Sequence, residues 1–356
     1  MKILFGLHGT THTEIAQAEI NAFQKAGAQT EACAYGNWGA ANGMFNSFKL
    51  LLKNAFDLKK KAAIQKSDIV YLNTALDLKT LVRDSITIFI LKNYNKNIKI
   101  VLKFHGSESK TVFSKNNRLK NYIFKKASLL LVLSNEERNN FLSVGVPADK
   151  VQVTANVIDK SLYVPDPGFK NSLGLPGETA ILLFVGRFMH EKGILDLAEA
   201  CRLLKETGKK FKLFCLGDGP LVDEIKKLID THGLEDNIKL LGHIPESETR
   251  GYYANCDMLI LPTYHEEGFP MAVFQAVGAG KPVITTRIRA AADYFTEYEN
   301  CMWVEKKNPR QLYQQVLALL NDKTLQDKMH VNNLVLAEKF TAEKIVNKLL
   351  EYFNKI

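Results

Sequence analysis

The sequence predicts an α/β protein made of two doubly wound parallel sheets. Apolar strand-like segments alternate with amphipathic helical segments in both halves of the chain, which is typical of parallel sheets. The length of 356 residues fits two domains at roughly 100–200 residues each. A stretch rich in Pro and Gly at 163–178 interrupts the alternation and predicts a linker.

The first half of the chain predicts six strands and at least one well-defined helix. Residues 13–27 form an amphipathic pattern that ends at Gly27, and further helical stretches separate several strands. We expect an N-terminal domain over 1–163. Its predicted strands are 2–8, 30–36, 68–73, 98–106, 128–134 and 151–159.

The second half repeats the alternation after the linker. A helix is predicted over 193–208, and we expect a second Rossmann-like domain over 164–340. The last residues, 341–356, predict one more amphipathic helix. The predicted strands of this half are 180–188, 211–219, 237–244, 257–263 and 281–287.

Composition narrows the class of protein. The chain is 46% hydrophobic and 24% charged, as expected of a soluble globular protein. Its longest apolar runs are far shorter than the ~20 residues of a membrane span, and its start lacks the pattern of a secretory signal. The five cysteines form no CxxC pair, which argues against a disulfide framework or a zinc site. We therefore expect a cytoplasmic protein.

The positive charge is concentrated in the first half. Residues 1–160 hold 23 basic and 12 acidic side chains, whereas the remainder holds 24 and 26. Such asymmetry predicts an anionic partner. Two stretches, 48–66 and 118–128, mix lysines with apolar residues. They are either ordinary amphipathic surface helices or docking segments for an anionic lipid surface.

Ligands of open α/β sheets bind at the carboxyl ends of the strands, so residues just after strands are the candidates for a site. Gly186, Arg187 and Lys192 follow the first strand of the second domain and lead into a helix. Two cations beside a helix N-terminus favour an anion site, and the alternative is a solvated basic loop.

The next two strands also end in distinctive residues. Gly217 and Gly219 would allow close backbone approach to a ligand, while Asp218 could instead cap the following helix. His243 and Ile244 end the following strand, where backbone groups could contact a nucleobase. His243 could equally be a residue of the rim only.

The stretch HEEGFPMAVFQAVGAGKPVIT (265–285) combines acids, a turn and an apolar helix. Pro270 marks the predicted start of that helix, and Glu267 just precedes it. A carboxylate there could stabilise the helix dipole or face a ligand. Gln275 has only apolar neighbours, which predicts a buried amide. It would bond either to core backbone or to a ligand that also touches Glu267.

Three histidines follow strands of the first domain: His8, His12 and His105. A single His beside a Gly is usually structural, but two such loops at the carboxyl ends of one sheet strengthen the prediction of a site.

Taken in order, several motifs resemble the retaining glycosyltransferases of family four (glycosyl transferases group 1), which have the GT-B fold and include many bacterial cell-surface polysaccharide enzymes. The resemblance covers nearly the whole chain and is strongest over 180–286. It rests on VGRFMHEKG, GDGP, LGHI and EEGFPMAVFQAVGAGKPVI, and on SNEERNNFLSVGVPADKVQVTANVID at the end of the first domain.

This resemblance implies roles for individual residues. Arg187 and Lys192 would hold the diphosphate of the sugar donor, Glu267 would face the transferred sugar, and His105 would lie near the reacting sugar. The final helix would return to the first domain. The residues implied in donor binding are Gly9, Gly186, Gly217, Gly219, His243, Ile244, Gly268, Phe269, Pro270 and Gln275, with Thr10 beside Gly9 in the cleft.

Two departures from the family pattern stand out. The second acid of the signature, which holds the ribose hydroxyls, is replaced by Gln275. An amide still accepts a hydroxyl but lacks charge-assisted acceptance by two oxygens, so we expect ribose binding weaker by about 1–2 kcal/mol. In addition, the usual Gly-Gly stretch after TTR is replaced by IRAAADYF, which alters the expected sugar contacts.

The resemblance implies a retaining, metal-independent hexosyltransferase that uses a UDP- or GDP-linked sugar and needs no cofactor; no Asp-x-Asp motif suggests a metal. The acceptor would be a saccharide or a polyprenyl-diphosphate-linked saccharide, at the inner membrane face through peripheral attachment. Nucleic acid is not expected as a partner. Two alternatives remain: a catalytically weak sugar- or nucleotide-binding protein, suggested by Gln275, and a nucleotide-sugar epimerase. A dehydrogenase is disfavoured because no GxGxxG follows the first strand.

Overall fold

A computed structural model describes residues 1–7, 13–36, 43–107 and 117–356. The chain divides into two compact units, each described by itself. The first unit comprises Met1–Val157, Glu266–Phe269 and Ala342–Ile356, and the second comprises Ile158–His265 and Pro270–Thr341. The chain therefore returns to its first unit twice after leaving it.

The first unit is built on a six-stranded sheet in the order β2-β1-β3-β4-β5-β6, and all of its paired strands are parallel. Parallel neighbours need crossover connections, which the intervening helices provide. The strands are β1 (Lys2–Leu7), β2 (Gln29–Ala34), β3 (Ile69–Leu76), β4 (Lys99–Ser107), β5 (Leu129–Val132) and β6 (Val151–Val153).

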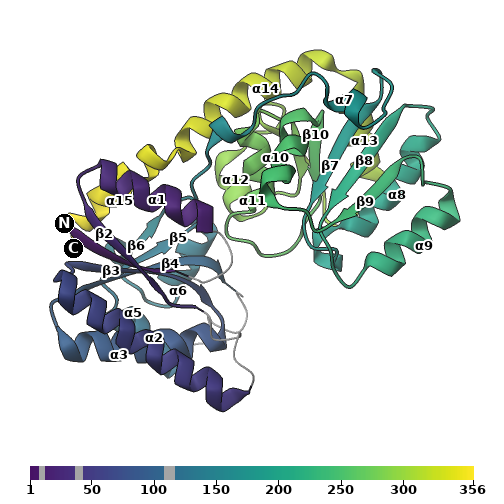
Figure 1. Cartoon of the computed structure of the whole chain (residues 1–356). Coiled ribbons are helices and arrows are strands. Elements are labelled where there is room, and N and C mark those ends of the chain that lie inside the picture. The colour runs from purple at the N-terminus through teal and green to yellow at the C-terminus, as the bar shows by residue number, and fades with distance from the viewer. Residues whose placement is uncertain (8–12, 37–42, 108–116) are drawn as a thin grey trace. The chain divides into compact units, whose positions relative to one another are not determined.

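Helices cover both faces of this sheet. Figure 1 shows α1 and α15 side by side on one face and the row of α2, α3 and α5 on the other, and these neighbours are in contact. The helices are α1 (Thr13–Lys25), α2 (Met44–Gln65), α3 (Leu78–Tyr94), α5 (Arg118–Lys126), α6 (Asn135–Ser143) and α15 (Ala342–Phe353), with a 3-10 turn at Ala148–Lys150.

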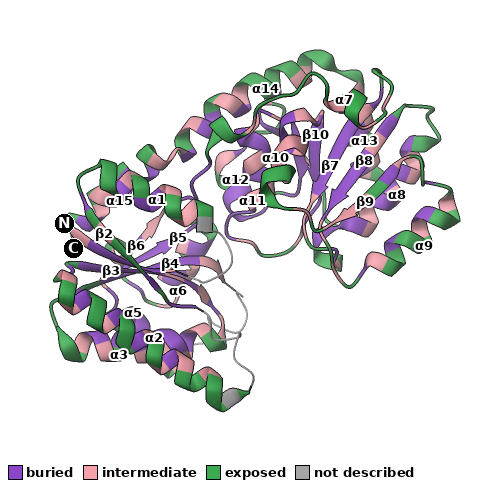
Figure 2. Cartoon of the chain, in the orientation of Figure 1, coloured by how far each residue is buried: buried purple, intermediate pink, exposed green. Residues whose placement is uncertain are grey.

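The inner strands of the first sheet are buried on both sides, as Figure 2 shows, whereas the edge strand β2 is mostly exposed. Alternate residues of each strand face the two helical layers, so apolar side chains line both faces. One exception is Lys103 on β4, whose side chain is fully buried and pairs with Glu19 of α1 at 3.0 Å. Tyr71 donates to the same carboxylate at 2.7 Å, so this buried charge pair has the additional hydrogen bond it needs.

The C-terminal helix α15 is an integral part of the first unit. Phe353 is 3% exposed, and its ring stacks on Phe23 of α1 with centroids 5.7 Å apart. The ring of Tyr71 lies 6.0 Å from the same phenylalanine. The helix therefore completes the core on the α1 face of the sheet.

The second unit holds another six-stranded sheet, in the order β12-β11-β10-β7-β8-β9, again with parallel pairs. The strand order reverses between β7 and β10, and such a switch point is where α/β sheets bind ligands. The strands are β7 (Ala180–Val185), β8 (Phe211–Leu216), β9 (Ile238–Gly242), β10 (Met258–Leu261), β11 (Val283–Thr285) and β12 (Cys301–Trp303).

Two groups of helices flank the second sheet (Figure 1). In one group α8 contacts α9 and α13, and in the other α11 contacts α10 and α14. The helices are α8 (Ile194–Lys205), α9 (Val222–His232), α10 (Glu246–Asn255), α11 (Met271–Gly278), α12 (Arg289–Tyr294), α13 (Pro309–Asn321) and α14 (Lys323–Ala337), with the short α7 (Phe169–Ser172) before β7. Single 3-10 turns lie at Lys160–Leu162, His190–Lys192 and Glu338–Phe340.

Backbone hydrogen bonds join the loops at the carboxyl edge of the second sheet. Gly186 N donates to Leu216 O at 3.0 Å, and Gly217 N donates to Gly242 O at 2.8 Å. A Cβ atom on Gly217 would lie 2.0 Å from Gly186 O, and its φ is +138°. A Cβ on Gly219 would lie 2.4 Å from Phe188 O. These glycines let the loops after β7 and β8 pack backbone against backbone.

The predicted fold class is confirmed, whereas several strands were predicted to be longer than they are. The strand expected at 151–159 ends at Val153, and the one expected at 211–219 ends at Leu216. The strand β12 has only three residues, and the sequence patterns did not identify it. Contacts place the first division of the chain at 157/158, a few residues before the predicted linker.

Within the residues that the structure describes, no helix combines the length and the hydrophobicity that crossing a membrane would require.

Phe353→Ala should destabilise the first unit by about 3–5 kcal/mol, because it removes a buried aromatic ring that contacts two others. Chemical denaturation followed by circular dichroism would measure the loss. Phe45→Ala is the matched control, since Phe45 is 81% exposed and should lose little stability. Equal effects of the two substitutions would show that α15 does not contribute to the core.

Gly217→Ala should destabilise the second unit, because alanine is strained at this φ by about 1–3 kcal/mol and its methyl group would overlap Gly186 O. Gly177→Ala is the control, because a Cβ atom on Gly177 would meet none of the described atoms within 4 Å and its φ is not positive. Thermal unfolding of both variants would measure the difference. Identical midpoints would contradict the packing of these two loops.

Candidate functional site

The loop between β7 and α8 holds three residues predicted for the site. Gly186 follows β7 directly, and Arg187 beside it is exposed. Lys192 closes a 3-10 turn just before α8 and is 6% exposed. The helix behind the loop has 12 residues, so its N-terminal dipole adds to the two cations. This loop has the groups that an anion site requires.

A second loop, after β10, is bonded to the first across the switch point. Glu191 O accepts hydrogen bonds from Tyr264 N at 2.8 Å and His265 N at 3.0 Å. The Thr263 hydroxyl donates to the same oxygen at 3.1 Å. Burial raises the pKa of Tyr264, and the charges of Asp196 and Glu191 raise it further. The turn that carries Lys192 is therefore fixed by the residues after β10.

Close packing also fixes the start of α8. Gly193 has φ +69°, and a Cβ atom there would lie 2.5 Å from Pro262 O. Only glycine fits this contact without movement of the backbone. Glycine is therefore required here by packing within the protein and not by a ligand. The same contact places the N-terminus of α8 directly beside the loop after β10.

The loops after β8 and β9 hold four more predicted residues. Gly217 and Gly219 pack on the loop after β7. This packing alone requires glycine at both positions, without any contact to a ligand. Asp218 accepts from Gly219 N at 2.7 Å, and its own carbonyl accepts from Phe188 N at 2.9 Å. His243 is exposed and Ile244 half-buried, just beyond the end of β9. The four predicted residues (Gly217, Gly219, His243 and Ile244) lie at the same edge of the sheet as Arg187.

The helix α11 corrects one expectation. Pro270, predicted at the first helical position, is the N-cap, and Val273 and Phe274 are fully buried. Gln275, however, is half-buried rather than buried, and its amide reaches another side chain instead of core backbone. Its Nε2 lies 3.5 Å from Oε1 of Glu246, the first residue of α10. The prediction of a buried amide was wrong, because this position faces α10.

His105 lies at an irregularity in the first sheet. Thr74 pairs with Phe104 and Leu76 pairs with Ser107, so β4 has one extra residue around His105. A bulge of this kind redirects side chains and is frequent next to active sites. The imidazole Nε2 is 2.7 Å from Oδ1 of Asn73 on β3, which orients the ring.

The end of β3 is fixed by a buried polar network. Asp84 of α3 is 1% exposed and accepts hydrogen bonds from Tyr35 and, at 2.8 Å, from Arg83 Nε. Arg83 also donates to Thr74 at 2.8 Å. Burial raises the pKa of Tyr35, and the negative charge of Asp84 adds to this effect. The network holds Thr74, the residue next to Asn73.

Glu267 and its neighbours belong to the first unit rather than to the start of α11. Glu267 forms an antiparallel bridge with Gly106, the residue next to His105. Gly268 is buried, and a Cβ atom there would lie 2.8 Å from a carboxylate oxygen of Glu137. Phe269 is 5% exposed. The structure thus brings the segment of Glu267 beside the strand of His105.

Some predicted residues are not placed, and some site residues were not predicted. Gly9 and Thr10 lie outside the described residues, as do His8 and His12. Asn73, Glu137 and Glu246 were missed. Glu137 had a readable signal, because it stands three residues after Ser134, which caps α6 by accepting from Glu137 N; the Glu137 carboxylate itself accepts from Leu133 N at 3.1 Å. The contacts of Asn73 and Glu246 join residues distant in sequence, so no local pattern reveals them.

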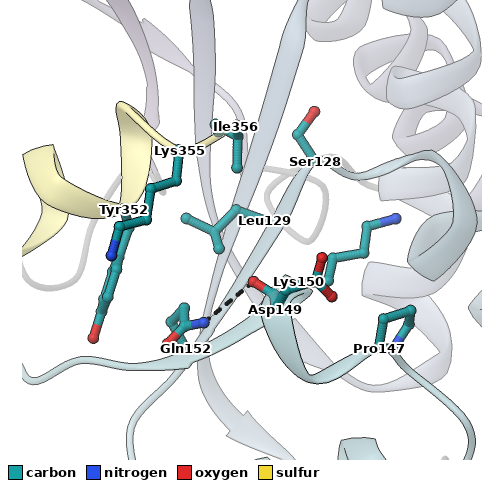
Figure 3. A pocket seen from close by; sticks show the side chains of 9 residues that line it. All are labelled: Ser128, Leu129, Pro147, Asp149, Lys150, Gln152, Tyr352, Lys355 and Ile356. Atoms are coloured by element: carbon teal, nitrogen blue, oxygen red, sulfur yellow. Dashed lines mark hydrogen bonds between the residues drawn. The ribbon is translucent and has the colours of Figure 1, made fainter.

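A cavity of about 380 Å³ lies at the amino ends of β5 and β6, away from the carboxyl edge (Figure 3). Lys150 in its wall donates to Phe124 O at 2.7 Å and Lys125 O at 3.1 Å, the last carbonyls of α5. Burial lowers the pKa of this lysine. The cavity contains none of the predicted site residues. Its lining is Ser128, Leu129, Pro147, Asp149, Lys150, Gln152, Tyr352, Lys355 and Ile356.

Residues 166–334 match the family described as Glycosyl transferases group 1. An uncharacterized glycosyltransferase of Methanocaldococcus jannaschii is 28% identical over 75% of this chain and 71% of its own length. The putative colanic acid biosynthesis glycosyltransferase WcaL of Escherichia coli is 27% identical over 62% of this chain and 54% of its own length. The amylovoran biosynthesis glycosyltransferase AmsK of Erwinia amylovora is 28% identical over 71% of this chain and 62% of its own length. The chain thus spans between about half and seven tenths of these relatives.

Solved structures share the fold over the whole chain. HepE of Anabaena, in complex with UDP, is 20% identical with a TM-score of 0.79 and full coverage of both chains. A glycosyltransferase from Rickettsia africae is 19% identical with a TM-score of 0.80, covering 99% of this chain and 98% of its own. With the two doubly wound sheets, these structures show that the chain has the GT-B fold, and the match to the glycosyl transferases group 1 family lies within its second half.

Proposed function

We propose that this glycosyltransferase transfers a sugar, with retention of anomeric configuration, from a nucleoside diphosphate sugar to a saccharide or lipid-linked saccharide in polysaccharide biosynthesis. The observation that carries the proposal is the loop between β7 and α8, where Arg187, Lys192 and a helix N-terminus lie at the switch point of the second sheet. The curated relatives named for colanic acid and amylovoran biosynthesis support the class of product.

The chemistry requires stabilisation of a departing diphosphate. The bond between the anomeric carbon and the diphosphate oxygen breaks, and the acceptor oxygen bonds to the same face of that carbon. The departing diphosphate takes the acceptor proton. Arg187, Lys192 and the dipole of α8 stabilise the negative charge that develops on it. No metal ion is needed in this scheme.

His105 and Glu267 are proposed to act on the transferred sugar. Asn73 orients the imidazole, and the bridge between Gly106 and Glu267 fixes the segment that carries the carboxylate. Donor residues of the second unit would include Gly186, Gln275 and the backbone near Ile244. The product configuration, read from the anomeric proton coupling by nuclear magnetic resonance, tests retention directly.

UDP should stabilise the protein in a thermal-shift experiment, with GDP tested beside it, because solved relatives contain UDP or UDP-glucose. A ligand at 100 times its dissociation constant stabilises by about 2.7 kcal/mol. Arg187→Ala should abolish the shift, because it removes a charge-assisted contact to the diphosphate. Lys226→Ala, at an exposed position of α9, is the control and should leave the shift intact. An unchanged shift in the Arg187 variant would refute the diphosphate assignment.

The acceptor side of the proposal includes attachment to an anionic membrane surface. Phe45 is 81% exposed and Phe56 53% exposed on α2, and Lys49, Lys53 and Lys60 are exposed on the same helix. Exposed aromatic rings among lysines suit the boundary between headgroups and acyl chains. We propose peripheral attachment at the inner face of the membrane through this helix.

Charge reversal of Lys49, Lys53 and Lys60 to Glu should weaken co-sedimentation with vesicles containing anionic phospholipid. Each lysine near such a surface contributes on the order of 1 kcal/mol, so the triple change should weaken partitioning roughly a hundredfold or more. Reversal of Lys209, Lys226 and Lys227, all in the second unit, is the matched control. Equal binding by both triple variants, or binding insensitive to salt, would exclude this surface.

A further inference from the structure

The side chain of Gln275 contacts a carboxylate, that of Glu246, although the sequence around position 275 shows only an amide. Glu246 begins α10 and lies two residues after Ile244, at the carboxyl edge of the second sheet. Gln275 reaches it from α11, with Nε2 and Oε1 3.5 Å apart. The two residues are 29 positions apart in the sequence, so only the fold brings them together.

This pair has little structural purpose of its own. Glu246 is exposed and Gln275 half-buried, so their long hydrogen bond competes with water and adds little stability. Glu246 is favourable at the start of α10, but Glu248 in the same first turn supplies negative charge there as well. The dipole of α10 therefore does not explain why the amide of α11 faces Glu246.

We propose that Glu246 and Gln275 together hold the 2′,3′-diol of the nucleotide ribose, with the charge supplied by α10 instead of α11. The inference rests on the proposed function, because it assumes that the second unit binds a nucleoside diphosphate. A carboxylate accepts hydrogen bonds from two neighbouring hydroxyls, and these charge-assisted bonds are about twice as strong as neutral ones. The amide of Gln275 donates to the same carboxylate and orients it.

The same contact explains why an acid at position 275 would be unfavourable in this chain. Gln275→Glu would place two carboxylates within about the distance now spanned by the amide contact, and they would repel each other. The substitution alone should therefore weaken nucleotide binding at neutral pH. The double variant Gln275→Glu with Glu246→Gln again has one carboxylate and one amide, so nucleotide binding should return towards the wild-type value.

The test compares ribose with deoxyribose. Binding of UDP and 2′-deoxy-UDP, and of GDP and 2′-deoxy-GDP, would be measured by isothermal titration calorimetry on the full chain. We expect wild-type protein to prefer the ribonucleotide roughly tenfold, as one lost charge-assisted hydrogen bond implies. Glu246→Gln should reduce this preference to about twofold, because a neutral amide loses the charge assistance, and the double exchange should return it towards the wild-type value. Glu248→Gln is the control and should behave as wild type.

The outcomes separate this inference from the proposed function. If Glu246→Gln keeps the wild-type preference for ribose, the assignment of Glu246 is wrong while nucleotide binding stands. If Gln275→Glu alone strengthens binding, the carboxylate belongs on α11 and the pairing is also wrong. If the wild-type protein binds neither UDP nor GDP, both the inference and the proposed function fail. Glu246→Gln and Glu248→Gln should leave the unliganded thermal midpoint as in the wild type, because both positions are exposed.

Discussion

The close packing of backbone on backbone at the carboxyl edge of the second sheet determines the candidate donor site. Gly186 O leaves no room for a side chain at position 217, and the hydrogen bond from Gly186 N to Leu216 O holds the same two loops together. Through Glu191 the loop after β7 is joined in turn to the residues after β10. Arg187 and Lys192 therefore project from a loop with little freedom, which is what preorganised stabilisation of charge requires.

The first unit achieves a similar rigidity by different means. There, a buried ionic network around Asp84 holds the end of β3, and an extra residue in β4 redirects the backbone at His105. Networks of this kind stabilise a single arrangement when each member has its partners. The residues proposed to act on the sugar are thus supported by side chains, whereas those proposed for the diphosphate are supported by backbone.

The sequence was sufficient to predict the fold class and the match of residues 166–334 to the glycosyl transferases group 1 family, because these depend on local periodicity and on residue order. Strand ends were less well predicted, since the end of a strand such as β8 is defined by where its pairing with neighbouring strands stops, which depends on tertiary structure. The burial of Gln275 was misjudged because its apolar neighbours occupy other sides of the helix, while position 275 shares its side with half-buried Met271. Contacts such as those of Glu246 and Asn73 depend on tertiary structure and have no local signature.

The path of the chain has a consequence for dissecting this protein. Because Glu266–Phe269 and α15 belong to the first unit, no single cut separates the two units into complete pieces. A fragment ending at Val157 would lack the ring that stacks on Phe23 and the strand partner of Gly106. The complementary fragment would carry an orphaned helix with its apolar side exposed to water. Each unit thus has its own core, but neither complete unit corresponds to one continuous stretch of the chain.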